Sequence, residues 1–485
     1  MISRKSILVL GLIVFASFVI YLGWSSLTSG FGFPLDDAWI HQTYARNFGE
    51  RYQWSFLIDA PSGGSTGPLW GAIIAVLYLL KIPPLWGTYF VGFVILWGTA
   101  IAGSVLFGKL SPQNKPYKLF AGILIAAEWH LVWSALSGME TILLIFLSLI
   151  FFCWLLDKKE NWWLPGVLIG ISVWVRPDGL TLLGPAVMSL LLRDLPLKKM
   201  LKKGLTFAAG ALLFFGPYIL FNWLVSGDLW PNTFYAKQAE YEVLRQSGLF
   251  GRYLKVGLQF VTGVGILLLP GIIVELKDQI QSKNWEAVTA FIWMAGYIGL
   301  YAWRLPVTYQ HGRYIIPAMP IGFLFGLSGL IKAAEMRAKE LWRRVVSGAW
   351  IGSAIIVAAS FWIYGARAYA MDVAVIETEM VRTARWIEEN TEKNAVIAAH
   401  DIGALGYFAE RKILDLAGLI TPDVIPFIRN EGKLAEYLDK EKADYLVTFP
   451  SWYSELTEEL IPVYQSEGEF APSFGMDNMA VYEWK

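Results

Sequence analysis

Two adjacent carboxylates, Asp36 and Asp37, follow the first apolar run of the chain, and an amphipathic segment over residues 39–48 comes directly after them. One interpretation is structural: Asp36 caps a helix, and Asp37 is a first-turn acid that the helix dipole favours. The other is chemical: two carboxylates at the mouth of a membrane cavity can deprotonate a hydroxyl group or bind a divalent ion. The residues alone leave both interpretations open.

Further polar side chains stand between or within later apolar runs. Glu140 either caps the helix that begins after it or contributes an acid to a site. Arg176 and Lys237 either anchor the chain at lipid headgroups or bind an anion. Glu128 and His130 lie inside an apolar run, where ionisable residues are candidates for function, although each could simply pair with a neighbouring helix.

The elements that must position these residues are mostly transmembrane helices. The chain has 485 residues, of which 55% are hydrophobic and 16% are charged, and soluble domains usually carry about a quarter charged residues. The single cysteine, Cys153, lies in an apolar run, which excludes an intramolecular disulfide and a cysteine-based metal site. No His or Cys cluster supports zinc. No basic, aromatic-interleaved patch supports a nucleic-acid partner.

Long apolar runs predict about eleven transmembrane helices. The runs lie near residues 6–26, 85–108, 117–136, 139–156, 162–175, 179–192, 202–225, 249–275, 286–303, 314–331 and 345–365. A shorter run, 69–82, better fits an interfacial or re-entrant helix. The first run is about twenty residues long and no small-residue cleavage site follows it, so we expect a retained helix rather than a signal peptide.

The positive-inside rule orients these helices. Basic residues gather in the N-terminal segment and in loops near residues 109–118, 158–159, 193–203, 277–283 and 332–344. If the segment 69–82 does not cross the membrane, all of these basic residues fall on the cytoplasmic side. The N-terminus is then cytoplasmic, the polar segments named above are extracytoplasmic, and the cell membrane is the expected location. Arg313 opens an apolar run on the side where cations are rare, and this favours a function for it.

The last quarter of the chain is predicted to be a different kind of structure. Residues 366–485 hold 22 Asp and Glu against 11 Lys and Arg, which indicates an acidic, soluble region. Residues 395–399, 412–416 and 444–449 read as strands, and 376–390 and 432–442 as helices, so we expect a small extracytoplasmic α/β domain. His400 and Asp401 end the first strand, either as a strand-to-turn junction or in contact with a substrate. The transmembrane domain is predicted to occupy residues 1–365.

The order of the polar segments resembles the GT-C glycosyltransferases, the multi-pass enzymes that use polyprenyl-phosphate sugars. The resemblance begins with Asp36-Asp37-Ala38-Trp39-Ile40 and Tyr44-Ala45-Arg46-Asn47, which are most similar to arabinofuranosyltransferase-like and mannosyltransferase-like members. It continues through Gly64-Ser65-Thr66-Gly67-Pro68-Leu69-Trp70, Ser137-Gly138-Met139-Glu140-Thr141, Arg176-Pro177-Asp178-Gly179, the segment 227–237, Gly312-Arg313-Tyr314 and the segment 401–407. Each segment alone is weak evidence for the resemblance, but together the segments cover most of the chain.

This resemblance implies roles for individual residues. A first-loop acid would be the general base, either Asp36 or Asp37, and Glu140 would be a second catalytic acid. The donor would be a polyprenyl-phosphate-linked sugar, whose leaving phosphate requires nearby cations. Residues implied in binding the donor phosphate or the substrate are His41, Tyr44, Arg46, Arg176, Asp178, Asn232, Tyr235, Lys237, His311, Arg313 and Tyr314.

The sequence thus predicts a polytopic α-helical membrane protein with a C-terminal α/β domain that acts as an inverting glycosyltransferase. The acceptor would be a cell-envelope glycan, a glycolipid or a protein. A monophosphate leaving group makes a metal less necessary, while the paired acids Asp36 and Asp37 leave room for a divalent cation. The alternative from another class is a membrane transporter or lipid flippase, which predicts polar sites near the bilayer midplane and internal repeats. A non-catalytic sensor is a further alternative.

Overall fold

A computed structural model describes residues 2–337 and 341–484, and most of these residues are helical. The predicted basic loop at 332–344 lies partly outside the described residues. The first helices are α1 (Arg4–Thr28), α2 (Asp36–Arg51), α3 (Pro68–Leu79), α4 (Pro84–Leu110), α5 (Lys118–Ala127), α6 (Trp129–Leu136), α7 (Thr141–Leu156), α8 (Trp163–Val175) and α9 (Leu183–Leu192). They continue with α10 (Leu197–Ser226), α11 (Asn232–Glu240), α12 (Leu249–Val261), α13 (Gly265–Gln281), α14 (Trp285–Arg304), α15 (Met319–Arg337) and α16 (Leu341–Ile376).

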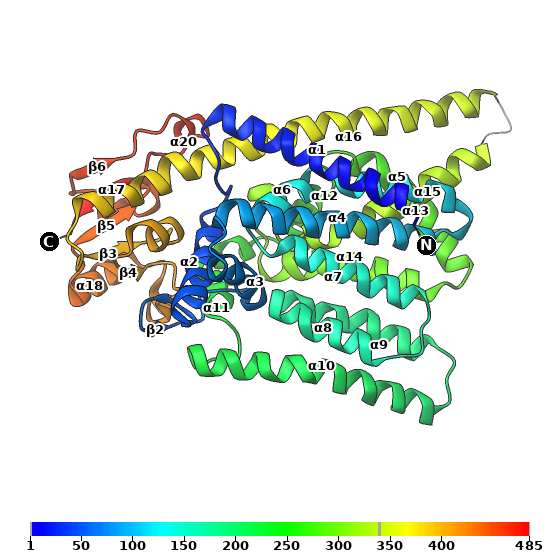
Figure 1. Ribbon diagram of the computed structural model, residues 1–485, viewed down its shortest axis with the longest axis horizontal. Coiled ribbons are helices and arrows are strands. Elements are labelled where there is room, and N and C mark those ends of the chain that lie inside the picture. Colours follow the sequence, from blue (N-terminus) through cyan, green and yellow to red (C-terminus); the bar gives the residue numbers. More distant parts are fainter. Residues whose placement is uncertain (1, 338–340, 485) are drawn as a thin grey trace.

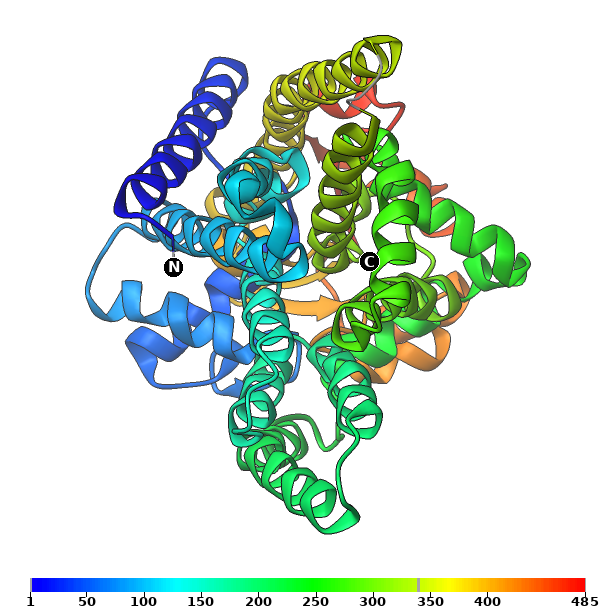
Figure 2. The ribbon, with the colours of Figure 1, turned by 90° about the vertical axis from the view of Figure 1, so that its right-hand side faces the viewer.

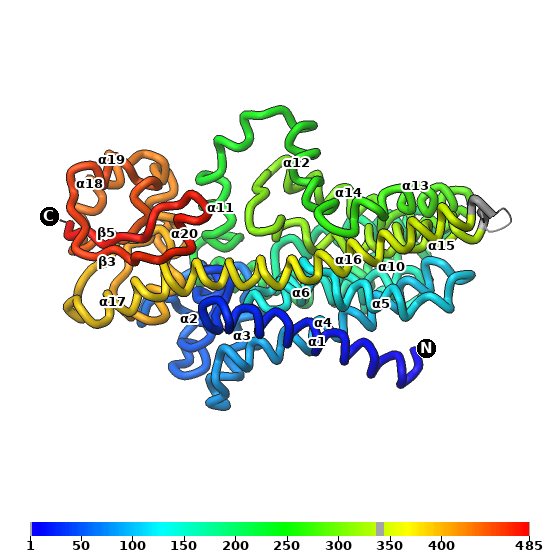
Figure 3. The backbone as a smooth tube through the Cα atoms, turned by 90° about the horizontal axis from the view of Figure 1, so that it is seen from above, coloured from blue at the N-terminus to red at the C-terminus, as the bar shows by residue number. Residues whose placement is uncertain are grey.

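The helical body is elongated, and most of its helices run along the long axis of the molecule (Figure 1). The N-terminus of α1 lies at one end, and the C-terminal strands lie at the other (Figure 3). Seen along the long axis, α10 lies at the periphery of the bundle, where it packs on α8 (Figure 2). Its largely exposed apolar side chains are consistent with contact to lipid.

Within residues 2–337 and 341–484, five helical segments are long and apolar enough to cross a membrane, and counting each of two bent helix pairs as one span gives seven. The predicted number of eleven spans is therefore not confirmed. The run at 117–136 bends by 52° between α5 and α6, and the run at 249–275 bends by 107° between α12 and α13. The runs at 139–156 and 162–175 form the short helices α7 and α8. Apolar composition cannot reveal such breaks, because the residues on both sides remain apolar.

The first break has a polar cause. Glu128 is the N-cap of α6, and its carboxylate accepts hydrogen bonds from the backbone N–H of Leu131 at 3.2 Å. Its other oxygen lies 2.8 Å from Nδ1 of His130. Both side chains are buried. The Glu128 carboxylate thus satisfies one backbone N–H that the helix break exposes. Glu128 pairs with His130, two residues away, rather than with a neighbouring helix as the structural alternative supposed.

The C-terminal region contains α17 (Arg382–Asn390), β3 (Val396–Ala399), β4 (Lys412–Asp415), α18 (Glu431–Glu441), β5 (Tyr445–Thr448), α19 (Ser454–Thr457), β6 (Pro462–Gln465), α20 (Phe470–Ser473) and β7 (Ala480–Glu483). The strand order is β4-β3-β5-β7-β6, in which β3 is parallel to β4 and β5, and β7 is antiparallel to β5 and β6. The strands predicted at 395–399, 412–416 and 444–449 correspond to β3, β4 and β5. A separate hairpin of β1 (Ser55–Leu57) and β2 (Ala60–Pro61) follows α2.

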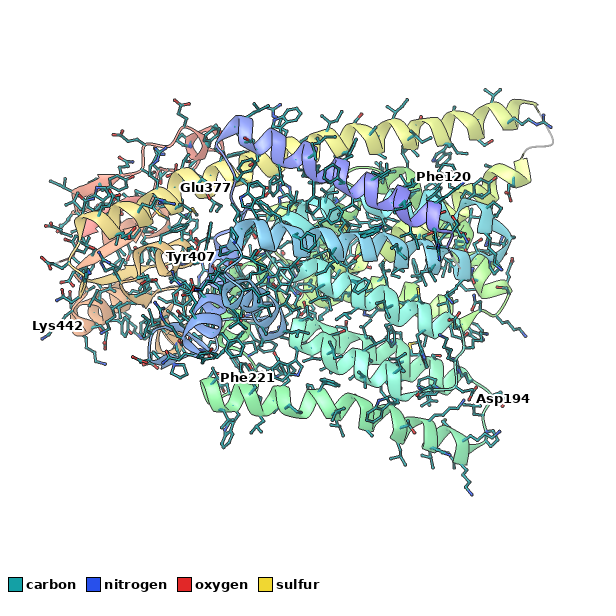
Figure 4. The ribbon with its side chains drawn as sticks, in the orientation of Figure 1. Phe120, Asp194, Phe221, Glu377, Tyr407 and Lys442 are labelled. Atoms are coloured by element: carbon teal, nitrogen blue, oxygen red, sulfur yellow. The ribbon has the colours of Figure 1, made fainter. Side chains whose placement is uncertain are left out.

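The helical body and the C-terminal region meet in a continuous contact that we call the seam. The long helix α16 leads from the body into this region (Figure 1). Tyr407 lies beside α2 (Figure 4), where Arg46 lies over its ring at 4.7 Å and donates to its carbonyl oxygen at 2.9 Å. Tyr78 of α3 also donates to the Tyr407 hydroxyl at 3.1 Å. These contacts hold the segment between β3 and β4 against α2 and α3.

Candidate functional site

The start of α2 brings the two adjacent carboxylates to the seam. Leu35, rather than Asp36, is the N-cap residue, and it makes no side-chain capping hydrogen bond. Asp36 and Asp37 are both in the first turn, where successive side chains point about 100° apart. Of the two interpretations that the sequence left open, the N-cap role of Asp36 is therefore excluded, and both acids are directed to other partners.

Asp36 is bound to the C-terminal region. Its Oδ2 accepts a hydrogen bond from the backbone N–H of Gly403 at 2.6 Å, and its Oδ1 accepts one from Ala404 at 2.8 Å. The residue is only 8% exposed. Burial, and then the nearby charge of Asp401, raise the pKa of Asp36 to about 8. Asp36 therefore joins the two parts of the molecule and favours the protonated form at neutral pH.

Asp37 lies among cations. Its Oδ2 accepts a hydrogen bond from Nη2 of Arg313 at 2.6 Å and lies 3.5 Å from Nζ of Lys237. Both cations also donate to the hydroxyl group of Tyr314, at 3.1 and 3.2 Å. Although burial alone would raise it, Lys237 and Arg313 hold the pKa of Asp37 below its ordinary range. Among the described residues, no hydrogen bond uses its Oδ1, so this oxygen remains free to accept one.

A second polar network lies deeper in the body. Arg176 lies 3.2 Å from Oε1 of Glu140 and 2.9 Å from Oδ2 of Asp178, and it also donates to the hydroxyl group of Tyr301. Nε2 of His41 lies 3.0 Å from the other Glu140 oxygen. The segments around residues 41, 140 and 176, which are far apart in the sequence, therefore converge. Arg176 is thus shared between two carboxylates.

Two cavities border the Asp37 cluster. The inner cavity, of about 100 Å³, is lined mostly by the helical body, including Glu140, Arg176, Asp178, Tyr301 and Arg304. The seam cavity, of about 780 Å³, lies between the body and the C-terminal region. The residues that line both cavities are Asp37, Ile40, Lys237, Arg313 and Leu419. Asp37 and its two cations thus form a shared wall between the cavities.

Arg313 has capacity for a further anion. Its Nη2 binds Asp37 and Tyr314, whereas its Nη1 is buried and has no hydrogen-bond partner within 2–337 and 341–484. A buried guanidinium N–H without a partner is costly. Because Arg313 lines both cavities, an anion placed against it would satisfy this group.

Several predicted site residues are brought together, and others are not. His41, Glu140, Arg176, Asp178, Lys237, Arg313 and Tyr314 line the inner cavity or contact its charged network. Tyr44 binds Ser62 and the backbone of Gly64, and Arg46 binds Glu410, so both hold structural contacts outside the cavities. Asn232 and Tyr235 are on α11 but line neither cavity. His311 pairs with Asp372 at 2.7 Å and packs on Trp129 and Trp133.

Some residues that line the two cavities could not be identified from the sequence, because only tertiary packing brings them there. Arg304 ends α14 and lines the inner cavity, where it lies 3.3 Å from the centre of the Phe234 ring. Arg304 directly follows the predicted apolar run at 286–303, and this position was the available signal. Glu240, Trp452 and Tyr453 line the seam cavity together with His400 and Asp401. No local pattern predicts this convergence, because Glu240 is more than two hundred positions away from Trp452 and Tyr453.

The two acids do not form a divalent-cation site in this arrangement. Both oxygens of Asp36 accept backbone N–H groups, and one oxygen of Asp37 binds Arg313. In the part of the chain that the structure describes, no group of three or more His, Cys, Asp or Glu side chains could hold a metal ion. The nearest charges to Asp37 are cations, which suits an anionic ligand instead.

Comparisons with known proteins identify the fold. ArnT from Cupriavidus metallidurans, in a structure bound to undecaprenyl phosphate, is 15% identical, with a TM-score of 0.59 and 97% of each chain covered. The archaeal oligosaccharyltransferase AglB from Archaeoglobus fulgidus, in complex with an inhibitory peptide and a dolichol-phosphate, is 11% identical, with a TM-score of 0.58, and the match covers 92% of this chain and 69% of AglB.

The arabinofuranosyltransferase AftD from Mycobacteria is 14% identical, with a TM-score of 0.53, and the match covers 99% of this chain and 40% of AftD. These likenesses confirm, at the level of the fold, the resemblance to GT-C glycosyltransferases drawn from the sequence. A family model described as a domain of unknown function (DUF8728) matches residues 369–482. No curated protein matches the sequence.

Proposed function

We propose that this chain is an inverting glycosyltransferase that transfers a sugar from a polyprenyl-phosphate donor to an acceptor on the extracytoplasmic side of the cell membrane. The observation that carries the proposal is the position of Asp37, which borders both cavities and lies against Arg313 and Lys237. A transferase needs a base between two substrates and cations near the leaving phosphate. Both requirements meet at this shared wall.

The donor phosphate is assigned to the cations of the inner cavity. As the bond between the anomeric carbon and the phosphate oxygen breaks, negative charge develops on the leaving group. Arg313 offers its unpartnered Nη1, and Lys237 and Arg304 line the same cavity. Arg176 is less available, because Glu140 and Asp178 already balance its charge. The polyprenyl chain would extend from this cavity into the bilayer.

Asp37 is assigned the role of general base, and Asp36 is not. The acceptor hydroxyl attacks the anomeric carbon from the face opposite the phosphate, and its proton passes to Oδ1 of Asp37. One displacement of this kind inverts the configuration of the anomeric carbon. Asp37 is 28% exposed in its side chain, whereas Asp36 is buried with both oxygens occupied. Glu140, buried against His41 and Arg176, would orient the inner network.

We also assign the overall orientation. Residues 1–365 would form the catalytic membrane domain, with the N-terminus in the cytoplasm. Residues 366–485 would form an extracytoplasmic domain that closes the acceptor side of the site. The basic loops predicted to be cytoplasmic support this orientation. The charged inner network then lies toward the extracytoplasmic end of the bundle, near the seam.

The experiment is a donor screen with the full chain in lipid nanodiscs. Radiolabelled polyprenyl monophosphates carrying arabinofuranose, mannose or other single sugars are each supplied with a mixture of oligosaccharide, glycolipid and peptide acceptors. We expect one donor to release polyprenyl phosphate, and NMR of the product to show the inverted anomeric configuration. Retention of configuration would contradict the single-displacement mechanism. In proteoliposomes, movement of intact donor between leaflets without cleavage would favour the transporter alternative.

A further inference from the structure

The seam cavity contains a set of groups that the proposed reaction does not use. It extends from the Asp37 cluster to the ends of β3 and β4 and to the segment 450–453. Its volume, about 780 Å³, is within the range of about 300–1,000 Å³ typical of small-ligand sites. It has room for more than the single hydroxyl group that a transferase activates, so its walls can select the acceptor.

We propose that the seam cavity binds a neutral saccharide, whose hydroxyl group is presented to Asp37, and that Trp452 and Asp401 are the principal recognition residues. The inference rests on the proposed function for its reaction, but the binding itself can be measured without the donor. It narrows the acceptor from any extracytoplasmic hydroxyl compound to one class.

Aromatic surface in the cavity suits the C–H faces of sugar rings. Trp452 and Tyr309 remain 44% and 43% exposed although they line a cavity. Tyr241 and Tyr453 line it as well. His400 packs edge-on against Trp452 with ring centres 5.2 Å apart, which holds the indole ring in place. Large, rigid aromatic surfaces that are partly uncovered offer contact area at a small entropic cost.

The cavity contains hydrogen-bond acceptors without partners, so a ligand that fits it must supply donors. Oδ2 of Asp401 and Oε1 of Gln310 are buried acceptor atoms that have no partner among the described residues. Nearby, Nδ1 of His400 lies 2.8 Å from the hydroxyl group of Tyr453, and Nε2 lies 3.4 Å from Oε1 of Glu240. Sugar hydroxyl groups can donate to the unpartnered oxygens and accept from a neighbouring hydroxyl. Phosphate or carboxylate ligands carry no comparable donors.

The charges of the cavity also argue against an anionic acceptor. Its lining includes the acids Asp37, Glu240, Asp372, Asp401 and Glu431, together with Asp36, which favours the protonated form, against the cations Lys237, Arg313 and Arg429 and the histidine His400. Lys237 and Arg313 are engaged by Asp37 at the inner end. The outer part of the cavity is therefore acidic, and a polyanionic glycan or a phosphorylated lipid headgroup would be repelled. A neutral polyhydroxylated ligand fits both the charge and the hydrogen-bonding requirements.

The test measures saccharide binding to the full chain in nanodiscs by saturation-transfer NMR, without any donor. The probes are mannotriose and arabinotriose, a sulfated disaccharide as the anionic comparison, and a Ser/Thr-rich peptide as the protein-like comparison. We expect a neutral trisaccharide to bind wild type, and Trp452→Ala to weaken its binding roughly tenfold. Asp401→Asn, which preserves the size of the side chain, should weaken binding of the same saccharide. The matched control is Trp484→Ala, because Trp484 is in the same region but outside the cavity and binds Asp439.

The possible results separate this inference from the proposed function. Loss of trisaccharide binding in Trp452→Ala and Asp401→Asn, with the control unchanged, would support the saccharide site. Equal binding by all variants would overturn it, because the saccharide would then bind elsewhere. Binding of only the peptide or the sulfated probe would also overturn it, even if wild type cleaved a lipid-linked sugar. Conversely, wild type could bind the trisaccharide and the two variants lose this binding, while wild type cleaves no lipid-linked donor. That result would support the saccharide site and count against the transferase.

Discussion

At the scale of single residues, two neighbouring acids with the same side chain have opposite surroundings. Asp36 faces backbone N–H groups and another acid, whereas Asp37 faces two cations. Burial and Asp401 raise the pKa of Asp36 to about 8, while Lys237 and Arg313 lower the pKa of Asp37 despite its burial. This division supports the proposal that Asp36 holds the seam together and that Asp37 is the base.

Arg313→Lys should impair donor use although the charge is conserved. The guanidinium group holds Asp37 and Tyr314 with Nη2 and leaves Nη1 for a phosphate oxygen, whereas a lysine ammonium is a single point charge. We expect kcat/KM for the lipid-linked donor to fall roughly tenfold to a hundredfold. The measurement is initial rate against donor concentration. Arg245→Lys is the matched control, since Arg245 lies in the turn after α11 and lines neither cavity. Equal rates in the two variants would remove Arg313 from donor binding.

At the scale of elements, the critical contact joins the first turn of α2 to the turn after β3. Gly403 approaches Asp36 so closely that a Cβ at this position would overlap the backbone oxygen of Asp36. The overlap is with backbone rather than with a movable side chain, so it can be relieved only by separating the two elements. The absence of a side chain at Gly403 is therefore a requirement of the seam.

Gly403→Ala is accordingly expected to destabilise the seam by about 1–3 kcal/mol. Thermal unfolding should occur at a lower temperature, and limited proteolysis should release the C-terminal region more readily. The control is Gly432→Ala in α18, where an added Cβ would meet only Asn430 at 3.6 Å and alanine favours the helix. Unchanged unfolding and proteolysis in Gly403→Ala would show that this close approach does not hold the two parts together.

The elements also show how far sequence reasoning reached. The strands β3, β4 and β5 were predictable, because short apolar runs ended at turn residues. The positions of Arg176 and Arg313 near a shared site followed from the order of polar segments and from the topology. The bends at Glu128 and Gly263 were not predictable, because buried polar pairing and backbone conformation create them inside apolar runs. The separate partners of Asp36 and Asp37 depend on residues more than two hundred positions away.

At the scale of the whole molecule, ionisation at the seam should make stability depend on pH. Burial first, with neighbouring acids, raises the pKa of Asp36 to about 8 and that of Asp401 to about 6, and burial raises that of Asp415 to about 6. Folding therefore favours their protonated forms. The stability they contribute is complete below the unfolded pKa of about 4 and is lost as pH rises through about 6 to 8. His400, whose pKa is raised in the fold, acts in the same direction.

We therefore expect the unfolding temperature of the protein in nanodiscs to fall by several degrees between pH 5 and pH 9. Asp401→Asn should make this dependence shallower, because it removes one of the ionising groups and the charge that raises the pKa of Asp36. Differential scanning calorimetry across this range measures both effects. An unfolding temperature that rises with pH, or the same slope in wild type and Asp401→Asn, would contradict the protonation states assigned to the seam.

If Asp37 is the base of a transferase that cleaves a polyprenyl-phosphate sugar, replacing it with Asn should slow cleavage without loss of donor binding. Asp37→Asn and the control Asp59→Asn, which changes an exposed acid in the hairpin after α2, are given saturating donor and acceptor in nanodiscs. Release of polyprenyl phosphate is followed in a single turnover, with bound donor measured separately. We expect a loss of at least about a hundredfold in Asp37→Asn, with donor still bound and the control at wild-type rate. Wild-type turnover in Asp37→Asn would contradict it.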